Sequence, residues 1–364
     1  MKIVVIGTRG IPNIQGGVET HCEELYPRLA KMGCDITIMR RSCYIAENNK
    51  INDYKGVHLK DVYAPHKKSL EAIVHSMLCV IKARMLNPDV VHVHAIGPGL
   101  CIPFARLLGL RVVSTNHGPD YDRKKWGKLA KSMLKLGEWC QAKFSNEVIV
   151  ISKVIANILE TNYGRANTQL VFNGVTPPVK ATTQDYINSL GLEPKKYVLG
   201  LGRFVEEKNF HQLIEAWNKL SDKHGFKLVI AGDADHEDDY SRRLKQLAKE
   251  SGVVLTGFIK GEKLNEILTH AGLFILPSSH EGLPISLLEA MSYNLDSLVS
   301  DIPANKIPSL SEDDFFHCGD IDDLCLKIKQ KLDNLKLGRE YDLSLYNWDN
   351  IALQTLEVYN TACK

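Results

Sequence analysis

Two glutamates stand eight positions apart in the apolar stretch SSHEGLPISLLEAM, residues 278–291. Pro284 suits the first position of a helix, so we expect Glu281 in the loop before this helix and Glu289 inside it. Eight helical residues span at most roughly 12 Å. By contrast, two carboxylates that act as acid and base on one glycosidic bond lie roughly 5 to 10 Å apart and face each other. The spacing favours two carboxylates that grip separate hydroxyl groups of one extended ligand. The alternative is a helix-start carboxylate and an unrelated surface residue.

Two cations follow another junction between a strand and a helix, in GLGRFVEEKNFHQLIEAW. We expect the helix to begin near Glu207, which places Lys208 in its first turn, where the helix dipole disfavours a cation unless an anion is bound. Arg203 offers phosphate oxygens a planar fork, and Lys208 offers a point charge. With the two glutamates, this pattern predicts a nucleoside diphosphate sugar as the ligand. Alternatively, both cations pair with surface glutamates.

The first loop, IGTRGIPNIQGGVET, offers backbone rather than side chains. It fails the dinucleotide fingerprint, because Arg9 and Pro12 stand where two of three glycines belong. Gly16 and Gly17 open a helix, where the backbone can approach a ligand and its N–H groups can face an anion. The alternative is a flexible turn without a ligand.

Several histidines and acidic residues could also do chemistry. His117 follows the strand expected over 111–115, at the end of the sheet where ligands bind, and is a candidate for substrate contact. His92 and His94 share one face of a strand and could bind a metal, but without an evident third ligand we expect them to be packed strand residues. The run GDADHEDDY, with Asp233, Asp235, Asp238 and Asp239, lacks the features of an EF-hand and is more typical of a solvated loop entering a helix. We therefore predict neither a metal nor another cofactor.

Residues 123–143 combine basic and apolar side chains at helical spacing. The residues concerned are Arg123, Lys124, Lys125, Lys128, Lys131 and Lys135, with Trp126, Leu129, Met133, Leu136 and Cys140. Such a helix could lie on an anionic membrane surface. It could equally pack its apolar side on a sheet and leave its lysines in solvent. Nucleic acid is not expected as a partner, because stacking aromatics and recognised modules are missing.

Secondary-structure elements must position these residues. Along the whole chain, short apolar runs typical of strands alternate with segments that have the periodicity of helices. The alternation predicts an α/β protein with two doubly wound, Rossmann-like domains. The stretch NGVTPPVKATTQ, residues 173–184, has the composition of a linker. We therefore expect domains over 1–177 and 178–346, followed by a helix over 347–364. Parallel sheets bind ligands beyond the carboxyl ends of their strands, which favours a site in a cleft between the domains.

Composition narrows the class of protein further. The chain has 364 residues, more than one hydrophobic core usually organises. No window approaches the roughly 20 apolar residues of a membrane span, and the nine cysteines are scattered without a C-x-x-C pair. We expect reduced thiols and a cytoplasmic protein. Residues 1–178 carry 24 Lys and Arg against 14 Asp and Glu, while residues 179–364 carry 21 against 29. Only the first half suits an anionic partner.

The combination of GRFVEEKN with EGLPISLLEA resembles the retaining glycosyltransferases of family 4, which have the GT-B architecture. The resemblance runs from Gly16-Gly17 to YNWDNIALQTLEVYN, which is similar to a helix that returns to the first domain. The stretches IGTRGIP and HGPDYDRKKWGKLAK resemble a bacterial polysaccharide subgroup that includes proteins assigned as rhamnosyltransferases. A histidine that contacts a hydroxyl matters less for a 6-deoxy sugar, so His117 and a rhamnose donor are in mild tension.

The resemblance implies a role for each candidate residue. Arg203 and Lys208 would bind the diphosphate and stabilise it as it leaves, without a metal. Glu289 would hold the ribose, and Glu281 would hold the transferred sugar. The residues expected beside them are Gly282 and Leu283 in the same loop, and Gly16, Gly17 and His117 in the first domain.

The resemblance also implies the partners. The donor would be a UDP, dTDP or GDP sugar, bound by the second domain. The acceptor would be a saccharide of a bacterial surface polysaccharide such as O-antigen or capsule, either free or linked to polyprenyl diphosphate, and would bind the first domain. Two alternatives share the nucleotide site: a sugar-nucleotide epimerase of the same architecture, and a non-catalytic assembly protein that binds nucleotide sugars.

Overall fold

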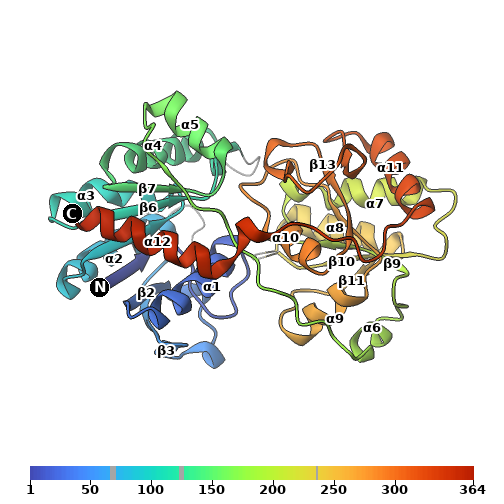
Figure 1. Ribbon diagram of the computed structural model, residues 1–364, viewed down its shortest axis with the longest axis horizontal. Helices are drawn as coiled ribbons and strands as arrows, with labels where there is room; N and C mark the ends of the chain where they lie inside the picture. The colour runs from blue at the N-terminus through green and yellow to red at the C-terminus, as the bar shows by residue number, and fades with distance from the viewer. Residues whose placement is uncertain (66–70, 123–126, 235–236) are drawn as a thin grey trace. The chain divides into compact units, whose positions relative to one another are not determined.

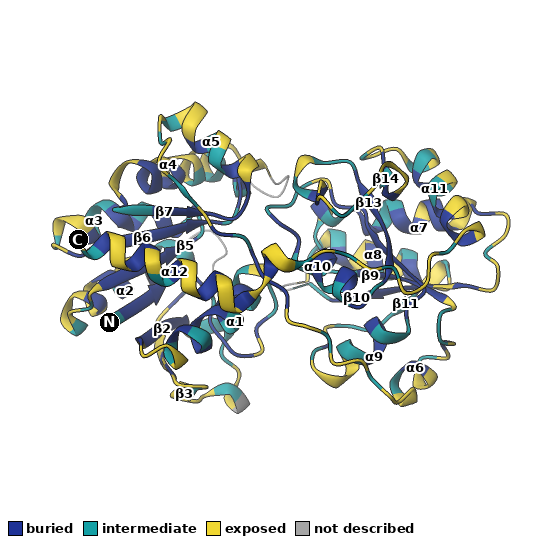
Figure 2. Ribbon diagram, viewed as in Figure 1, coloured by how far each residue is buried: buried dark blue, intermediate teal, exposed yellow. Residues whose placement is uncertain are grey.

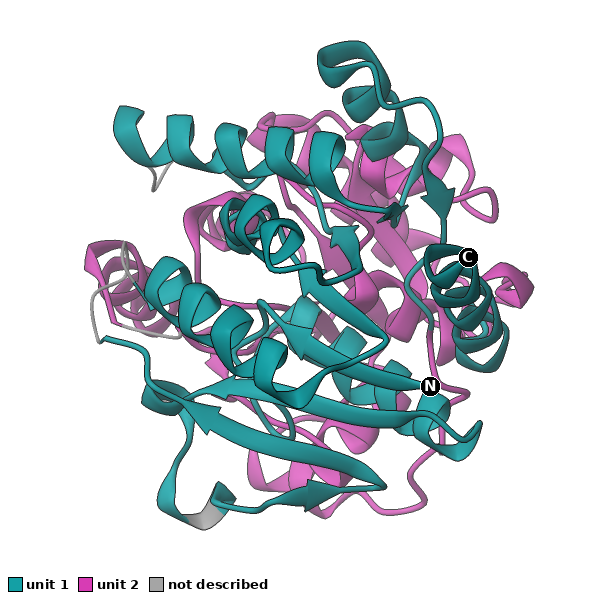
Figure 3. Ribbon diagram, turned by 90° about the vertical axis from the view of Figure 1, so that its left-hand side faces the viewer, with its two compact units in different colours: residues 1–174, 346–364 teal, residues 175–345 magenta. Residues whose placement is uncertain are grey.

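The computed structural model describes residues 1–65, 71–122, 127–234 and 237–364. The chain forms two compact units, which Figure 3 distinguishes by colour. Unit 1 comprises residues 1–174 and 346–364, and unit 2 comprises residues 175–345. Each unit contains one mostly parallel sheet with helices packed on it (Figure 1), which confirms the expected α/β class and the two doubly wound folds.

The sheet of unit 1 has eight strands in the order β3-β4-β2-β1-β5-β6-β7-β8. Every pairing is parallel except that of β3 with β4. The strands are β1 (Lys2–Ile6), β2 (Asp35–Arg41), β3 (Asp53–Tyr54), β4 (Val57–Val62), β5 (Val90–His94), β6 (Val112–Asn116), β7 (Glu147–Val150) and β8 (Gln169–Leu170). The helices are α1 (Gly17–Lys31), α2 (Glu71–Leu86), α3 (Ile102–Leu107), α4 (Lys128–Phe144), α5 (Lys153–Tyr163) and α12 (Trp348–Cys363).

Alternate residues of these strands enter two separate cores, one on each face of the sheet. In β1, Ile3 and Val5 pack with α1 and α12, whereas Val4 and Ile6 pack with α2 and α3. Successive side chains of a strand point to opposite faces, so a strand buried on both sides is apolar at most positions, and its polar side chains need hydrogen-bond partners. Figure 2 shows the result, with buried strands and helices exposed on their outer sides.

The sheet of unit 2 has six parallel strands in the order β11-β10-β9-β12-β13-β14. The strands are β9 (Tyr197–Leu201), β10 (Lys227–Ala231), β11 (Val254–Leu255), β12 (Leu273–Leu276), β13 (Asp296–Ser300) and β14 (Phe315–Phe316). The helices are α6 (Asp185–Ser189), α7 (Phe210–Lys219), α8 (Asp239–Glu250), α9 (Glu262–His270), α10 (Ile285–Ser292) and α11 (Ile321–Asp333). Side chains of α7 and α11 share one core with the central strands.

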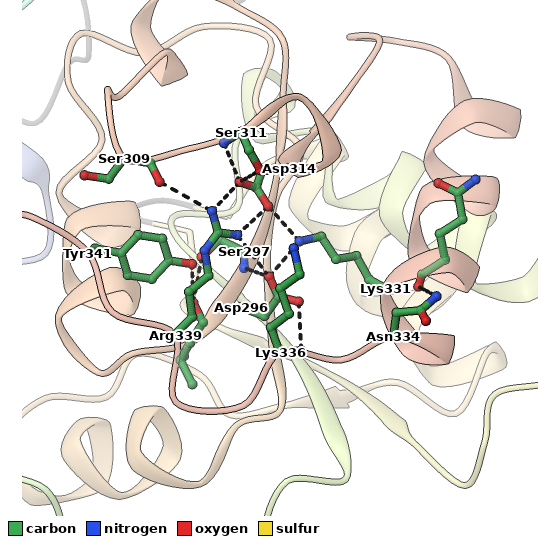
Figure 4. A network of polar contacts seen from close by, with 12 residues as sticks. Asp296, Ser297, Ser309, Ser311, Asp314, Lys331, Asn334, Lys336, Arg339 and Tyr341 are labelled. Carbon is green, nitrogen blue, oxygen red and sulfur yellow. Dashed lines mark hydrogen bonds and ion pairs between the residues drawn. The ribbon is translucent and has the colours of Figure 1, made fainter.

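A buried network of charges fastens the amino-terminal ends of β13 and β14 (Figure 4). The Lys331 ammonium donates to Asp296 at 2.6 Å and to Asp314 at 2.7 Å. The Arg339 guanidinium donates to both oxygens of Asp314, at 2.5 and 2.7 Å. Burial by itself would raise the pKa of Asp314, but the hydrogen bonds from Arg339 and Lys331 outweigh it and hold that pKa far below its usual range. Two buried acids are thus balanced by two cations.

Candidate functional site

The loops after two neighbouring strands of unit 2 carry the side chains expected to bind a nucleotide sugar. Strands β9 and β12 pair in parallel, so their carboxyl ends lie at the same edge of the sheet. Arg203 lies just after β9, and Lys208 ends the 3-10 turn η5 (Glu206–Lys208). Glu281 lies in the loop between β12 and α10, and Glu289 lies within α10. This edge is where parallel sheets bind ligands.

Lys208 and Glu281 form an ion pair, with Nζ and Oε1 2.5 Å apart. Their side chains are only 14% and 12% exposed, so water screens the pair less than it screens a surface pair. The resemblance to family 4 implies that these residues bind separate parts of the ligand, Lys208 the phosphates and Glu281 the sugar. Their direct contact means that an anion bound by Lys208 would also lie beside the Glu281 carboxylate.

Hydrogen bonds between the two loops hold this pair in place. The backbone N–H of Ser279 donates to the carbonyl of Glu207 at 2.9 Å. The side-chain amide of Asn209 donates to the carbonyl of Pro277 at 3.1 Å, and Asn209 is itself buried. The first contact joins two backbone groups and the second joins a buried side chain to the backbone, so the geometry of the pair does not depend on flexible side chains alone.

A close approach of two backbones positions the loop that carries Arg203. A Cβ on Gly232, which follows β10, would lie 1.9 Å from the carbonyl oxygen of Gly202. Gly232 also has a φ of 138°, which residues with a side chain rarely adopt. Any side chain at Gly232 would therefore displace the backbone next to Arg203.

The expected start of the helix after β9 is wrong. The helix begins at Phe210 rather than near Glu207, because Asn209 has a φ of 50° and interrupts the helical path. Lys208 thus precedes the helix and does not lie in its first turn, so the helix dipole acts on its charge less strongly than expected. Pro284 likewise precedes α10 instead of being its first residue.

The remaining candidates in unit 2 lie around α10. Glu289 is half-buried on the second turn of this helix, and Leu283 in the preceding loop is 8% exposed, with Gly282 half-buried beside it. Burial, and then the charge of Glu289, raise the pKa of Tyr293 to about 12. Glu289 therefore lies close to a neutral phenol at the edge of the core.

In unit 1, the loop before α1 already contains a carboxylate. Gly16 has a φ of 148°, and a Cβ there would lie 2.1 Å from an oxygen of Glu19. The Glu19 carboxylate accepts a hydrogen bond from the backbone N–H of Arg9 at 3.0 Å and is only 6% exposed. Part of the site expected to bind an anion near Gly16 and Gly17 is thus filled by the protein itself.

His117 ends a chain of buried hydrogen-bonding groups in unit 1. Its Nε2 lies 3.0 Å from Nδ1 of His94, and Nε2 of His94 lies 2.5 Å from the hydroxyl of Tyr26. The Tyr26 hydroxyl also contacts Nδ1 of His92 at 2.9 Å, and that nitrogen lies 2.6 Å from the hydroxyl of Tyr359 in α12. Every ring nitrogen of His92 and His94 therefore has a protein partner, Nε2 of His92 being bonded to a threonine hydroxyl.

The buried histidines should make unit 1 acid-sensitive. Burial lowers the pKa of His21 to about 4 and that of His92 to about 3, and burial together with neighbouring imidazoles holds the pKa of His94 and His117 well below the usual range of histidine. The unfolded chain takes up protons near pH 6.5 while the folded chain does not, so stability falls as the pH falls below that value. Each such histidine lowers the free energy of unfolding by about 1.4 kcal/mol for every pH unit between its unfolded pKa and its folded pKa.

We expect thermal unfolding at about pH 5.5 to show a lower melting temperature for unit 1 than at about pH 7.5. Unit 2 provides the control, because no histidine is buried in its described part. Limited proteolysis assigns each transition to its unit. Equal shifts of both transitions would contradict a role for the buried histidines.

The acidic run of unit 2 is explained by helix capping and ion pairs. The Asp238 carboxylate accepts from the backbone N–H of Ser241 at the start of α8, at 2.9 Å. Asp233 pairs with Lys245 at 2.9 Å, while Asp235 lies outside the described residues. In the parts of the chain that the structure describes, no three His, Cys, Asp or Glu side chains gather as a metal would require.

The basic amphipathic segment is helical from Lys128 to Phe144, and Arg123 to Trp126 lie outside the described residues. Its buried side, which includes Glu138 and Cys140, packs on unit 1. Leu129 on the other side is 77% exposed. The two expectations were a helix on a membrane surface and a helix packed on the sheet. The structure has features of both, because the helix packs on the domain and also leaves apolar side chains in solvent. No helix of the described residues is long and apolar enough to cross a bilayer.

Some site features escaped sequence reasoning. In the sequence, Arg9 stands out only as a departure from the dinucleotide fingerprint. In the structure, its guanidinium lies 5.0 Å from the centre of the Tyr44 ring. Glu19 was not singled out at all. Its position three residues after Gly16, in the first turn of a helix, is the signal that could have singled it out, because the amino end of a helix favours a carboxylate.

Two family models match the chain, one in each half. "Glycosyltransferase Family 4" matches residues 15–177, and "Glycosyl transferases group 1" matches residues 182–340. An uncharacterized glycosyltransferase of Methanocaldococcus jannaschii is 25% identical over 393 aligned positions, which span 100% of this chain and 98% of that protein. An amylovoran biosynthesis glycosyltransferase of Erwinia amylovora is 24% identical over 50% of each chain.

Solved structures of the same architecture superpose on the chain. A sucrose-phosphate synthase from Thermosynechococcus elongatus matches with a TM-score of 0.81 and 20% identity, over 99% of this chain and 98% of that one. The Anabaena protein HepE, solved in complex with UDP-glucose, matches with a TM-score of 0.75 and 16% identity, over 100% and 98%. The fold, the two family matches and the glycosyltransferase relatives agree with one another. The chain is a glycosyltransferase of the GT-B type.

Proposed function

We propose that the protein is a retaining, metal-independent glycosyltransferase that uses a nucleoside diphosphate sugar. The observation that supports this most is the shielded ion pair of Lys208 with Glu281, beside Arg203 at the carboxyl edge of β9 and β12. The site offers cations that can bind a diphosphate, and the carboxylate that contacts Lys208 can accept hydrogen bonds from sugar hydroxyls.

In the proposed reaction, the bond between the anomeric carbon and the diphosphate breaks, and a bond to an acceptor hydroxyl forms on the same face of the sugar. The acceptor proton passes to the departing phosphate oxygen. Lys208 and Arg203 stabilise the negative charge that develops on the leaving group, and this electrostatic stabilisation supplies most of the rate. Glu281 orients Lys208 and accepts a hydrogen bond from the sugar. In unit 1, burial keeps the pKa of His117 low and its imidazole neutral, which suits this side chain to hydrogen-bond a sugar hydroxyl.

The donor is a UDP, dTDP or GDP sugar in this proposal. The solved relative that was crystallised with UDP-glucose makes the uridine nucleotide the first to test. Thermal-shift measurements with UDP, dTDP and GDP sugars identify the base, because a ligand that binds only the folded state raises its melting temperature. If none of the three nucleotides shifted the wild-type protein, the proposal would be wrong.

The acceptor is a saccharide of a bacterial surface polysaccharide such as O-antigen or capsule, carried on polyprenyl diphosphate at the cytoplasmic face of the membrane. The excess of basic residues in the first half of the chain supports an anionic acceptor. The relative from amylovoran biosynthesis supports a polysaccharide product. The basic helix α4 would bring the enzyme to the membrane. Product formed from the donor alone, without an acceptor, would point instead to an epimerase.

The two glutamates should have separable effects. We expect Glu289→Ala to weaken nucleotide binding, because this carboxylate holds the ribose. We expect Glu281→Ala to slow transfer without weakening binding of the free nucleoside diphosphate, because this carboxylate holds the sugar and its loss leaves the Lys208 cation free for phosphate. Calorimetric titration with the free nucleotide, set beside the transfer rate, separates the two. The assignment is reversed if Glu281→Ala alone abolishes binding of the free nucleotide.

A further inference from the structure

One face of unit 1 carries much of the exposed apolar surface of the chain. Three helices, α2, α3 and α4, hold nine of the twenty large hydrophobic side chains that are exposed among the described residues. These nine are Met77 (37% exposed), Ile81 (48%), Met85 (81%), Leu107 (83%), Leu129 (77%), Met133 (36%), Leu136 (50%), Trp139 (39%) and Phe144 (38%). We call the outer side of these helices the three-helix face.

The three helices cover the same side of the sheet. Helix α4 packs against α3 and against the short turn η3 (Pro98–Cys101), and α2 packs against the same turn. The inner residues of α2 and α3 share one core with β1 and β5. The outer sides of the helices therefore all face away from that core, and Figure 2 shows exposed stretches along α4 and α2.

The charge of this face is almost entirely positive. Its basic residues are Lys82, Arg84, Arg106, Lys128, Lys131, Lys135 and Lys143. The three helices contain only two acidic residues, Glu71 and Glu138, and both are buried. Glu71 pairs with Arg41, and Glu138 accepts hydrogen bonds from Asn116 and Tyr163. Neither carboxylate faces solvent, so the lysines and arginines of the surface are not neutralised by their own helices.

We propose that the three-helix face docks on an anionic lipid bilayer. Apolar side chains interspersed with cations suit the boundary between acyl chains and acidic head groups, because the long lysine stems keep their charges in the head-group layer. Trp139 is of the type enriched at that boundary. The proposal extends beyond the single helix α4, since α2 and α3 add Met85 and Leu107, its two most exposed side chains.

A protein partner fits this face less well. Lysine is depleted at protein interfaces, and a second copy of the chain would bring seven like charges against seven. An acidic bilayer instead offers an opposite charge to every cation and a solvent for every apolar side chain. Docking rests on this surface alone and does not depend on the proposed donor, sugar or reaction.

The test is vesicle flotation with the full chain. We expect the protein to float with vesicles of phosphatidylcholine and phosphatidylglycerol but not with pure phosphatidylcholine vesicles. Flotation should weaken at high salt. Leu129→Ser with Leu136→Ser should abolish it, and so should Met85→Ser with Leu107→Ser. Lys128→Gln with Lys135→Gln should weaken binding on the order of fivefold for each lysine removed.

Matched variants elsewhere serve as controls. Leu345→Ser with Leu353→Ser removes two leucines that are 59% and 51% exposed outside the three-helix face, and should leave flotation unchanged. Lys219→Gln with Lys329→Gln is the control for charge. Each variant is checked by its melting temperature and by the thermal shift with nucleotide, so a failure of the donor assignment is seen separately.

Three outcomes would overturn the proposal. The first is no flotation of the wild-type protein with the anionic vesicles. The second is equal loss in the face variants and the controls. The third is a dimer in solution that Leu129→Ser with Leu136→Ser dissociates, which would assign the face to a second copy. If only the α4 variants lost flotation, α4 alone would be the docking element and the extension to α2 and α3 would be wrong.

Discussion

Replacing Lys208 with alanine is expected to lower kcat/KM for sugar transfer by roughly 100- to 1000-fold. This is the typical cost of removing one preorganised group that stabilises charge in the transition state. The Lys208 ammonium is held by Glu281 and is mostly shielded from water, so its charge acts on the leaving diphosphate with little screening. Steady-state kinetics with the donor identified by thermal shift measure the effect.

A surface lysine provides the matched control for Lys208. Lys219 pairs with Asp322 over the same distance, 2.5 Å, but its side chain is 51% exposed. Lys219→Ala should leave transfer unchanged. Lys208→Ala also leaves the Glu281 carboxylate without its cation, so its melting temperature is compared with that of the double variant with Glu281→Gln, which shows how far the unpaired charge destabilises the fold. A folded Lys208→Ala protein with wild-type transfer would refute the assignment.

Replacing Asp314 with asparagine is expected to destabilise unit 2 by about 3 to 5 kcal/mol. The substitution keeps the volume but removes the charge that neutralises Arg339 and Lys331, and both cations are then left in a buried network with only Asp296. For a unit of this size, the melting temperature should fall by roughly 6 to 20 °C. Calorimetry measures this change directly.

An exposed ion pair serves as the control for Asp314→Asn. It shows whether the loss of stability comes from the buried network or from removing any aspartate charge. Asp322 is 85% exposed in its pair with Lys219, and Asp322→Asn should change stability by less than about 1 kcal/mol. Nucleotide binding by Asp314→Asn below its melting temperature should persist, because the network lies at the amino ends of its strands and the site at the carboxyl ends. Equal stability of the two variants would show that burial of the network adds nothing.

The network also predicts a pH dependence. The folded pKa of Asp314 lies far below the value near 3.9 of an unfolded aspartate. The stability that this carboxylate contributes is therefore fully present above about pH 4 and is lost as the pH falls below it. Asp314→Asn should remove this acid-labile part, so the difference between wild type and variant should shrink in acid.

The periodicity of the sequence predicts the longer elements well, because burial on one or both sides leaves a regular pattern. The strand expected over 111–115 is present as β6, and the helix expected over 347–364 is present as α12. The short elements β3, β14 and α6 were not predicted, because two to five residues are too few to show a period. The break at Asn209 was also missed, since a left-handed asparagine depends on the tertiary contact with Pro277.

Site residues could be found from the sequence only where a charged side chain stands among residues of a different type. Glu281 and Glu289 were recognisable as carboxylates in an apolar segment. The pairing of Lys208 with Glu281 could not be predicted, because it follows from the order of strands in the sheet, which places β9 beside β12. The network of Asp296 and Asp314 could not be predicted either, since each residue alone looks like an ordinary surface charge.

The return of α12 to unit 1 has a consequence for biosynthesis. Trp348, Ile351 and Tyr359 belong to the same core as Ile3 and Val5, so this core can close only after the ribosome has made all of unit 2. Unit 2 is continuous in sequence and can fold while unit 1 still waits for its missing helix. The domain translated first is thus completed second, and one face of its sheet, covered by α1 but not yet by α12, stays incompletely buried for as long as translation of residues 175–345 takes.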